Sequence, residues 1–163
     1  LVFAEPSPTG PGVEVNVLEP LSGGTGGGSQ ADGLHARDVV DLANLRNSPL
    51  ETVESKSSTR VFVYGLRPDS AGAGKFRGGC GVVFEFEVLA PDCVIIARGM
   101  ERLRFQPWGL LGGACGAFGR IEVKRSGSDH FEQVHKADAL RASVGDVIRL
   151  STAGGGGPPT TQP

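Results

Sequence analysis

The chain has 163 residues, among them 26 glycines and 11 prolines, and carries a formal net charge of -2. A chain of this length can bury one modest core, and its richness in glycine and proline argues against a helical bundle. The small net charge gives no electrostatic reason to expect nucleic acid or an anionic membrane as a partner, and no apolar run is long enough to span a bilayer.

The first stretch, residues 1–31, alternates prolines and glycines and contains one short apolar alternation at Val13, Val15 and Val17. This composition is typical of an extended arm that ends in a flexible glycine run. The chain begins at a leucine and its only methionine is Met100, so we expect a processed piece or a fragment of a longer product. Chemistry that this chain lacks would then lie in an upstream region.

A short helix is predicted next, from about Pro49 to Glu54. Ser48 can cap its first turn, Pro49 suits the first helical position, and Glu51 falls three residues after the cap, which makes a capping box. We therefore interpret Glu51 as a helix-initiating residue and not as a catalytic acid.

Beyond the helix the apolar pattern has a period of two, which is typical of strands. In residues 60–66 this pattern predicts Val61 and Val63 on one face of a strand and Phe62 and Tyr64 on the other. The side chains of the two faces should therefore meet different surroundings.

Later segments continue the alternation and predict inward-facing side chains at Phe84, Phe86, Val88, Ile121, Val123, Val147, Ile148 and Leu150. The continuous apolar run at residues 93–99 suits a strand that is covered on both faces. The pair Gly145 and Asp146 is a hairpin signal ahead of the last strand.

Five or six strands with turn signals between them and little helix predict an all-β fold. We expect a short-stranded sandwich or a partly closed barrel with one short helix and many glycine-rich loops. The chain divides into an extended arm at residues 1–31, a β domain at residues 32–153 and an irregular tail at residues 154–163. Because Pro158 and Pro159 cannot continue a ladder, the tail should run irregularly over the surface or across a partner.

The stretch LRPDSAGAGKFRGGCG at residues 66–81 invites comparison with phosphate-binding loops, because glycines let backbone amides approach an anion. Its spacing excludes the two common fingerprints. A Walker A loop needs a glycine where Asp69 stands and a hydroxyl where Phe76 stands. A dinucleotide fingerprint needs a third glycine where Arg77 stands and a helix after it. The stretch therefore connects two strands.

The histidines give little support for a metal site. His130 and His135 are five residues apart, which does not match the four-residue spacing of zinc-binding helices and places them on opposite faces of a strand. His35, Asp38 and Asp41 could share a helical face, but such residues near a turn are usually solvated. We therefore predict no metal site in this chain.

Three cysteines, Cys80, Cys93 and Cys115, are an odd number without paired spacing, so a disulfide framework is not indicated and a reducing cytoplasm fits best. No signature of a serine or cysteine nucleophile is present. The catalytic residues are therefore left unassigned.

Arginine-rich clusters stand out along the chain. Their guanidinium groups could bind carboxylate or phosphate, but we favour pairing that ties loops together, with Asp69, Glu51 and Glu101 as acceptors. Trp108 is interpreted as a wedge that holds a turn. The candidate binding or interface residues are Arg46, Asn47, Asp69, Gly72, Gly74, Arg77, Arg98 and Trp108, and the remaining clustered arginines are Arg67, Arg102 and Arg104.

Four stretches, taken in order, resemble the C-terminal part of the hydantoinase B/5-oxoprolinase family, which also includes subunits of acetone and acetophenone carboxylases. The stretches are NLRNSPLETVES, YGLRPDSAGAGKFRGGCGVVFEFEVL, PWGLLGGACG and VGDVIRLSTAGGGG. The chain departs from the usual family pattern at residues 70–74, where Ala71 replaces a glycine, and at Pro158 and Pro159, which replace a Gly-Tyr-Gly ending.

The resemblance implies a portion of a B-type subunit of an ATP-dependent cyclic-amide hydrolase, working with a hydantoinase A-like partner that binds ATP and Mg²⁺ and phosphorylates an amide or enolate oxygen. It implies that any divalent metal of the B-type subunit is held by upstream segments, and that this piece binds no cofactor and is inactive alone. A subunit of an ATP-dependent ketone carboxylase and a non-catalytic assembly module are the alternatives.

Within this frame we expect residues 66–81 to form a rigid, interface-forming loop that packs against the remainder of the B-type subunit. Asp69 and Ser70 should start its turn, and Arg77 should project from its end. Several of its glycines should adopt left-handed backbone angles, with Gly72, Gly74, Gly78 and Gly79 as the candidates.

Overall fold

The computed structural model describes residues 1–18, 21–37, 49–97, 101–135 and 139–159. The elements in these ranges are β1 Val2–Pro6, β2 Val13–Val17, α1 Leu50–Lys56, β3 Thr59–Leu66, β4 Val82–Val88, β5 Cys93–Ile96, the 3-10 helix η1 Glu101–Leu103, β6 Arg120–Lys124, β7 Glu132–Val134, β8 Leu140–Ala142 and β9 Val147–Ser151. The fold is therefore mainly β, as predicted.

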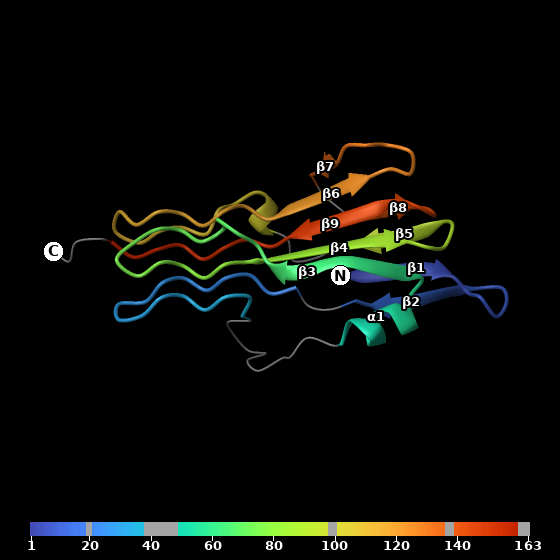
Figure 1. Ribbon diagram of the computed structural model, residues 1–163, viewed down its shortest axis with the longest axis horizontal. Helices are drawn as coiled ribbons and strands as arrows, with labels where there is room; N and C mark the ends of the chain where they lie inside the picture. Colours follow the sequence, from blue (N-terminus) through green and yellow to red (C-terminus); the bar gives the residue numbers. More distant parts are fainter. Residues whose placement is uncertain (19–20, 38–48, 98–100, 136–138, 160–163) are drawn as a thin grey trace.

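The strands form two antiparallel sheets, one in the order β2-β1-β5-β8 and the other in the order β3-β4-β9-β6-β7 (Figure 1). Their inner faces share one core. The rings of Phe3 from β1 and Phe86 from β4 meet edge to face, with their centroids 6.4 Å apart. Within the described residues this arrangement confirms the predicted sandwich, and the sheets do not close into a barrel.

The predicted alternation of β4 is confirmed. Phe84, Phe86 and Val88 are buried in the core. The two glutamates between them point away from it and form ion pairs with neighbouring strands, Glu85 with Arg149 at 2.7 Å and Glu87 with Arg60 at 3.2 Å. Ile121, Val123, Val147, Ile148 and Leu150 are also buried as predicted.

The beginning of the chain differs from the predicted extended arm, because β1 and β2 form a hairpin and β1 pairs with β5. Phe3 is fully buried in the shared core. The carboxylate of Glu5 accepts a hydrogen bond from the amide of Ser58 at 3.1 Å. The short sequence of β1 carries no strand signal, since its place is set by pairing with a strand that lies far away in the chain.

The predicted facing of β3 is wrong because a bulge interrupts its pairing with β4 between Val61 and Val63. A bulge adds a residue to one strand and reverses the facing beyond it. Val61 and Tyr64 therefore both pack against the core. Phe62 and Val63 are exposed to 51% and 43%.

The turn at Gly145 and Asp146 is present, but it does not make a hairpin. It joins β8 of one sheet to β9 of the other, so the chain crosses between the layers. Gly145 has φ +84, a left-handed angle that favours glycine. The hairpin prediction is therefore wrong, although the residues do form a turn.

Helix α1 begins at Leu50, one residue later than predicted, and Pro49 occupies the cap position without a side-chain hydrogen bond. Glu51 therefore lies too close to the cap for the predicted capping box. Ser48 lies outside the described residues. No helix in the described part of the chain is long and apolar enough to cross a membrane.

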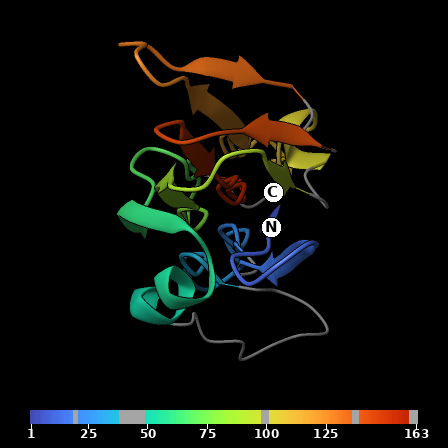
Figure 2. The ribbon, with the colours of Figure 1, turned by 90° about the vertical axis from the view of Figure 1, so that its right-hand side faces the viewer.

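Beyond the sandwich, extended segments run on along the long axis of the molecule (Figure 1). They belong to residues 21–28, 31–37, 70–81, 107–118 and 152–158, which carry no helix or strand assignment. We call these segments the glycine bundle. The last of them lies near the middle of the outline when the molecule is viewed along this axis (Figure 2).

Candidate functional site

The glycine bundle contains most of the predicted site residues that the structure describes, and it is built around residues 153–158. This segment overlaps the predicted irregular tail at residues 154–163; it forms neither helix nor strand, but from Ala153 to Gly157 it is buried and does not run over the surface. Glycines and prolines give no ladder pattern, so the sequence does not reveal that this segment packs against other extended backbones. We call residues 153–158 the central segment.

Backbone hydrogen bonds link the central segment to its neighbours on several sides. The amide of Gly155 donates to the carbonyl of Gly79 at 2.9 Å, and the amide of Gly157 donates to the carbonyl of Ala114, also at 2.9 Å. The carbonyl of Gly155 accepts from the amide of Gly72 at 2.8 Å. Two other segments of the bundle, residues 70–81 and 107–118, are thereby fixed to the central segment.

The contacts of the central segment repeat every three residues. The carbonyls of Ala153 and Gly156 accept hydrogen bonds from Gly24 and Gly27, and both pairs are three residues apart. Gly154 and Gly157 likewise face residues 70 and 73. A repeat of three residues is that of a polyproline II helix, which has no internal hydrogen bonds and must find partners outside itself.

The predicted left-handed angles in residues 66–81 are wrong. The positive-φ glycines of the described chain are Gly12, Gly112, Gly127 and Gly145, and none lies in this stretch. Gly72 and Gly78 are needed for another reason: a Cβ at Gly72 would lie 2.2 Å from the carbonyl oxygen of Ala114, and one at Gly78 would lie 1.9 Å from that of Gly155. Only glycine allows backbones to approach so closely.

The beginning of this stretch is held by Ser70 and Arg67. The hydroxyl of Ser70 donates to the carbonyl of Arg67 at 2.8 Å and accepts from the amide of Gly81 at 2.9 Å, which closes the loop at its base. Asp69 is exposed and has φ 52. The predicted turn therefore exists, with Ser70 as its hydrogen-bonding residue.

Arg67 ties loops together, as we favoured, but through backbone carbonyls and not through carboxylates. Its Nη1 donates to the carbonyls of Phe118 and Thr152. Burial, together with the nearby charge of Arg120, lowers the pKa of the Arg67 guanidinium. Hydrogen bonds to carbonyls offset part of the cost of burying this charge.

Of the other candidates, Gly74 packs against the central segment, where a Cβ would lie 2.2 Å from the carbonyl oxygen of Pro158. Arg77 is exposed and pairs with Asp32 at 3.5 Å, which joins residues 76–81 to residues 31–37. The sequence analysis expected the partners of the clustered arginines to be Asp69, Glu51 and Glu101, and Asp32 is not among them. Arg46, Asn47 and Arg98 lie outside the described residues.

Trp108 is not buried as a wedge, since it is 78% exposed. Its backbone holds it in place, because a Cβ at Gly156 would lie 1.8 Å from the Trp108 carbonyl oxygen. The indole side chain lines a hollow of about 450 Å³, the floor of which is formed by residues 153–156. The structure thus brings Gly72, Gly74 and Trp108 to the central segment.

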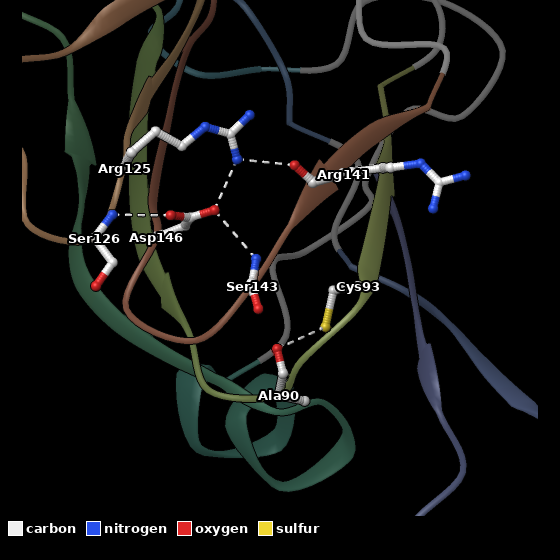
Figure 3. Close-up of polar contacts among 7 residues, drawn as sticks. All are labelled: Ala90, Cys93, Arg125, Ser126, Arg141, Ser143 and Asp146. Carbon is white, nitrogen blue, oxygen red and sulfur yellow. Dashed lines mark hydrogen bonds and ion pairs between the residues drawn. The ribbon is translucent and has the colours of Figure 1, made fainter.

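A polar cluster around Asp146, which the sequence analysis did not single out, lies at the crossing between the sheets (Figure 3). Its carboxylate accepts hydrogen bonds from Nη1 of Arg125 at 2.7 Å and from the amides of Ser126 at 2.9 Å and Ser143 at 3.1 Å. Burial alone would raise the pKa of Asp146, but these bonds and the charge of Arg125 outweigh it and lower the pKa. With donors from two neighbouring segments on both of its oxygens, the carboxylate acts as a structural anchor.

Cys93 borders the same cluster and is fully buried. Burial, with the negative charges of Glu5 and Asp92, raises the pKa of its thiol to about 11. Its Sγ donates to the carbonyl of Ala90 at 3.3 Å (Figure 3). A thiol in this state is neutral near pH 7 and is a weak nucleophile.

The remaining chemistry is sparse. Among the described residues, no group of three or more histidine, cysteine, aspartate or glutamate side chains is placed to hold a metal ion. One sequence signal could have revealed the glycine bundle: glycines recur at intervals of three in the pairs Gly24 and Gly27, Gly113 and Gly116, and Gly154 and Gly157.

The chain is similar to known proteins over most of its length. Its sequence matches a family model described as Hydantoinase B/oxoprolinase over residues 1–158. It is 31% identical over 141 residues to a putative B-type component of a D-/L-hydantoinase from Pseudomonas sp. (strain NS671), and the match covers 86% of this chain and 23% of that protein. The chain spans less than a quarter of the length of such curated relatives, with shares of 19%, 23% and 11%.

Two solved structures share the fold. A nucleotide-free acetone carboxylase aligns with a TM-score of 0.74 at 18% identity, over 97% of this chain and 25% of that chain. The ATP-dependent caprolactamase of Pseudomonas jessenii aligns with a TM-score of 0.72 at 23% identity, over 97% of this chain and 28% of that chain. At these identities the likeness concerns the fold alone.

Proposed function

The chain belongs to the hydantoinase B/oxoprolinase family, and from that premise we propose that it forms the C-terminal portion of a B-type subunit of an ATP-dependent cyclic-amide hydrolase. The observation that carries this proposal is the 31% identity to a putative hydantoinase component of the B type across 86% of the chain. An A-type partner would bind ATP and Mg²⁺. Three free cysteines fit a reducing compartment, and we propose the cytoplasm.

Within that subunit the proposed contribution of this region is mechanical. Many of its glycines pack backbone to backbone, and its buried carboxylate at Asp146 accepts hydrogen bonds from three donors. Groups so fully engaged are suited to holding a shape and not to exchanging protons with a substrate. The region would thus give the subunit a rigid body against which the remaining parts are positioned.

ATP turnover of the complete complex tests the choice of substrate. The complex should hydrolyse ATP when given 5-oxoproline or a hydantoin. Stimulation only by acetone or acetophenone with bicarbonate would contradict the hydrolase assignment and favour a ketone carboxylase, an alternative that the fold shared with acetone carboxylase keeps open.

Single alanine substitutions of Arg46, Asn47, Asp69 and Arg77 test the mechanical role. If this region is an assembly module, each variant that still assembles should keep kcat close to that of the natural complex. A loss of kcat by orders of magnitude in a variant with intact fold and assembly would show that the residue acts in the reaction. Size-exclusion chromatography and circular dichroism provide the controls for assembly and fold.

A further inference from the structure

The ring of segments around the central segment is closed by hydrogen bonds over most of its circumference. Residues 23–28 bind residues 76–81 through the amide of Gly79 and the carbonyl of Thr25 at 2.8 Å. Residues 76–81 bind residues 70–74 through Gly78 and Gly72 at 2.9 Å.

The ring continues in the same way on its other side. Residues 70–74 bind residues 113–117 through the amide of Ala114 and the carbonyl of Ala73 at 2.8 Å. Residues 113–117 bind residues 107–110 through the amide of Gly116 and the carbonyl of Pro107 at 2.9 Å. Each member of the ring therefore has a hydrogen-bonded neighbour, in unbroken succession from residues 23–28 to residues 107–110.

The ring is open at one place. In the part of the chain that the structure describes, no hydrogen bond joins residues 107–111 to residues 21–28. Two adjoining hollows of about 450 and 380 Å³ lie there instead and share Leu110. Residues 153–156 form the floor of the first, and Pro158 and Pro159 border the second. Together they make one groove along the central segment.

The backbone at the floor of this groove has spare hydrogen-bonding capacity. The amides of Gly155 and Gly157 donate into the closed part of the ring. Gly156 lines the groove and is buried, and within the described residues its amide donates no hydrogen bond. A buried amide without an acceptor costs free energy comparable to a lost hydrogen bond, so an acceptor placed in the groove would stabilise the bundle.

The rim of the groove is apolar and exposed. Trp108, Leu110 and Leu111 are exposed to 78%, 65% and 82%. Adjacent exposed side chains of this size mark interaction sites. Among the described residues that line the hollows, Arg102 and Lys75 carry charge and none carries a carboxylate, so an acidic group on the occupant would be favoured.

The packing of the ring indicates the conformation of the occupant. Extended segments of equal width can surround a central segment on all sides, and here the ring lacks one such segment. An α-helix with its side chains is roughly 10–12 Å across and is too wide for a place of this kind. A polyproline II segment with a small residue at every third position fits, because its repeat matches that of the floor.

We propose that this groove receives one further extended segment in polyproline II conformation, supplied by the part of the B-type subunit outside residues 1–163. The inference rests on the proposed function, since it needs a longer polypeptide. Its support is that the structural relatives are about four times longer, this chain covering 25% and 28% of them, so that most of such a polypeptide lies outside this region.

Site-specific photo-crosslinking in the complete subunit tests this proposal. A photoreactive amino acid is incorporated in place of Leu110, on the rim of the groove, or in place of Val13, which is 67% exposed on β2. Strand β2 belongs to the sandwich and lies away from the glycine bundle (Figure 1). Should the position of Leu110 not tolerate the replacement, Trp108 serves as the second site. Mass spectrometry of the digested protein identifies the peptide that is captured.

We expect the Leu110 probe to capture a peptide of the same polypeptide, outside residues 1–163, with glycine or alanine at every third position, and the Val13 probe to leave this peptide unmodified. Capture of a second copy, of the A-type partner or of a helical segment, or no capture at all, would overturn the inference. If the subunit is active and longer than this chain but its groove is open, only this inference is refuted. If the complex lacks the expected ATP turnover, or if the natural polypeptide does not extend beyond residues 1–163, the proposed function is refuted.

Discussion

In the sandwich the buried atoms belong to large side chains such as Phe3, Phe86 and Ile148, whereas at the centre of the glycine bundle they belong to the backbone of Gly154 to Gly157. The first region gains its stability from apolar area removed from water. The second gains it from hydrogen bonds and contacts between backbones that touch, and it must overcome the larger conformational entropy that glycine loses on folding. The two regions should therefore respond to opposite kinds of substitution.

Removing a side chain should harm the sandwich most. Phe86→Ala deletes a fully buried ring that packs against Phe3 and Phe84. We expect it to lower the free energy of unfolding by about 4 kcal/mol through lost burial and the cavity that remains. Urea denaturation would measure the change, with Phe62→Ala on the exposed side of β3 as the control. Equal losses in the two variants would contradict the assigned core.

Adding a side chain should harm the glycine bundle by nearly as much. A Cβ at Gly155 would lie 1.7 Å from the carbonyl oxygen of Thr25, so Gly155→Ala must push two backbones apart. We expect a loss of about 3 kcal/mol, since overpacking of this kind costs a few kcal/mol. Gly65→Ala is the matched control, because a Cβ there meets nothing within 4 Å. Unchanged stability of Gly155→Ala would mean that the segments are not in contact.

How far the sequence predicts these two regions follows from the same difference. Alternating side chains such as Phe84 and Phe86 are a local signal, so β4 is predictable from its own residues. β1 is not, because its five residues lie between β2 and β5, and the pairing with β5 joins residues far apart in the chain. In the glycine bundle no side chain reports which face is buried, and only the spacing of glycines by three carries information.

The candidate site shows the same division. Gly72 and Gly74 were predicted because their stretch is rich in glycine. The expected reason, a left-handed backbone, was wrong, and glycine is needed there because neighbouring backbones approach closely. Asp146 escaped prediction because its main partner, Arg125, lies 21 residues away and on another element. Pairing of this kind depends on the crossing between sheets, which no local pattern encodes.

Removing the carboxylate of Asp146, where the chain crosses between the sheets, should lower the free energy of unfolding by less than Phe86→Ala or Gly155→Ala. Asp146→Asn removes the charge that accepts from Arg125 and from two amides. We expect a loss of about 2 kcal/mol at neutral pH, typical of a buried charged hydrogen bond that loses one partner. Asp129→Asn, at an exposed position, is the control and should change little.

The effect of Asp146→Asn should also depend on pH. The pKa of Asp146 is lowered in the folded state. Its stabilising contribution is therefore fully present above the pKa of an aspartate in the unfolded chain, about 3.9, and is lost as the pH falls through the pKa of the folded state. The difference between the natural chain and the variant should shrink below about pH 4. A difference that grows on acidification would contradict the assigned direction.

The smallest change is expected on the rim of the groove. Trp108→Ala removes a side chain that is 78% exposed, so the free energy of unfolding of the isolated chain should change by no more than about 0.5 kcal/mol. Thermal unfolding would measure the change. A drop as large as that of Gly155→Ala would show that the indole is buried and would place Trp108 within the bundle.

The central claim is that backbone packing in the glycine bundle is as firm as side-chain packing in the sandwich, so that both unfold together. Native-state hydrogen exchange tests it directly by comparing the amide of Gly155, which donates to Gly79, with the amide of Phe86 in β4. The account predicts that both amides exchange only through global unfolding and give the same opening free energy. Exchange of Gly155 through a local opening, several kcal/mol less costly than that of Phe86, would contradict it.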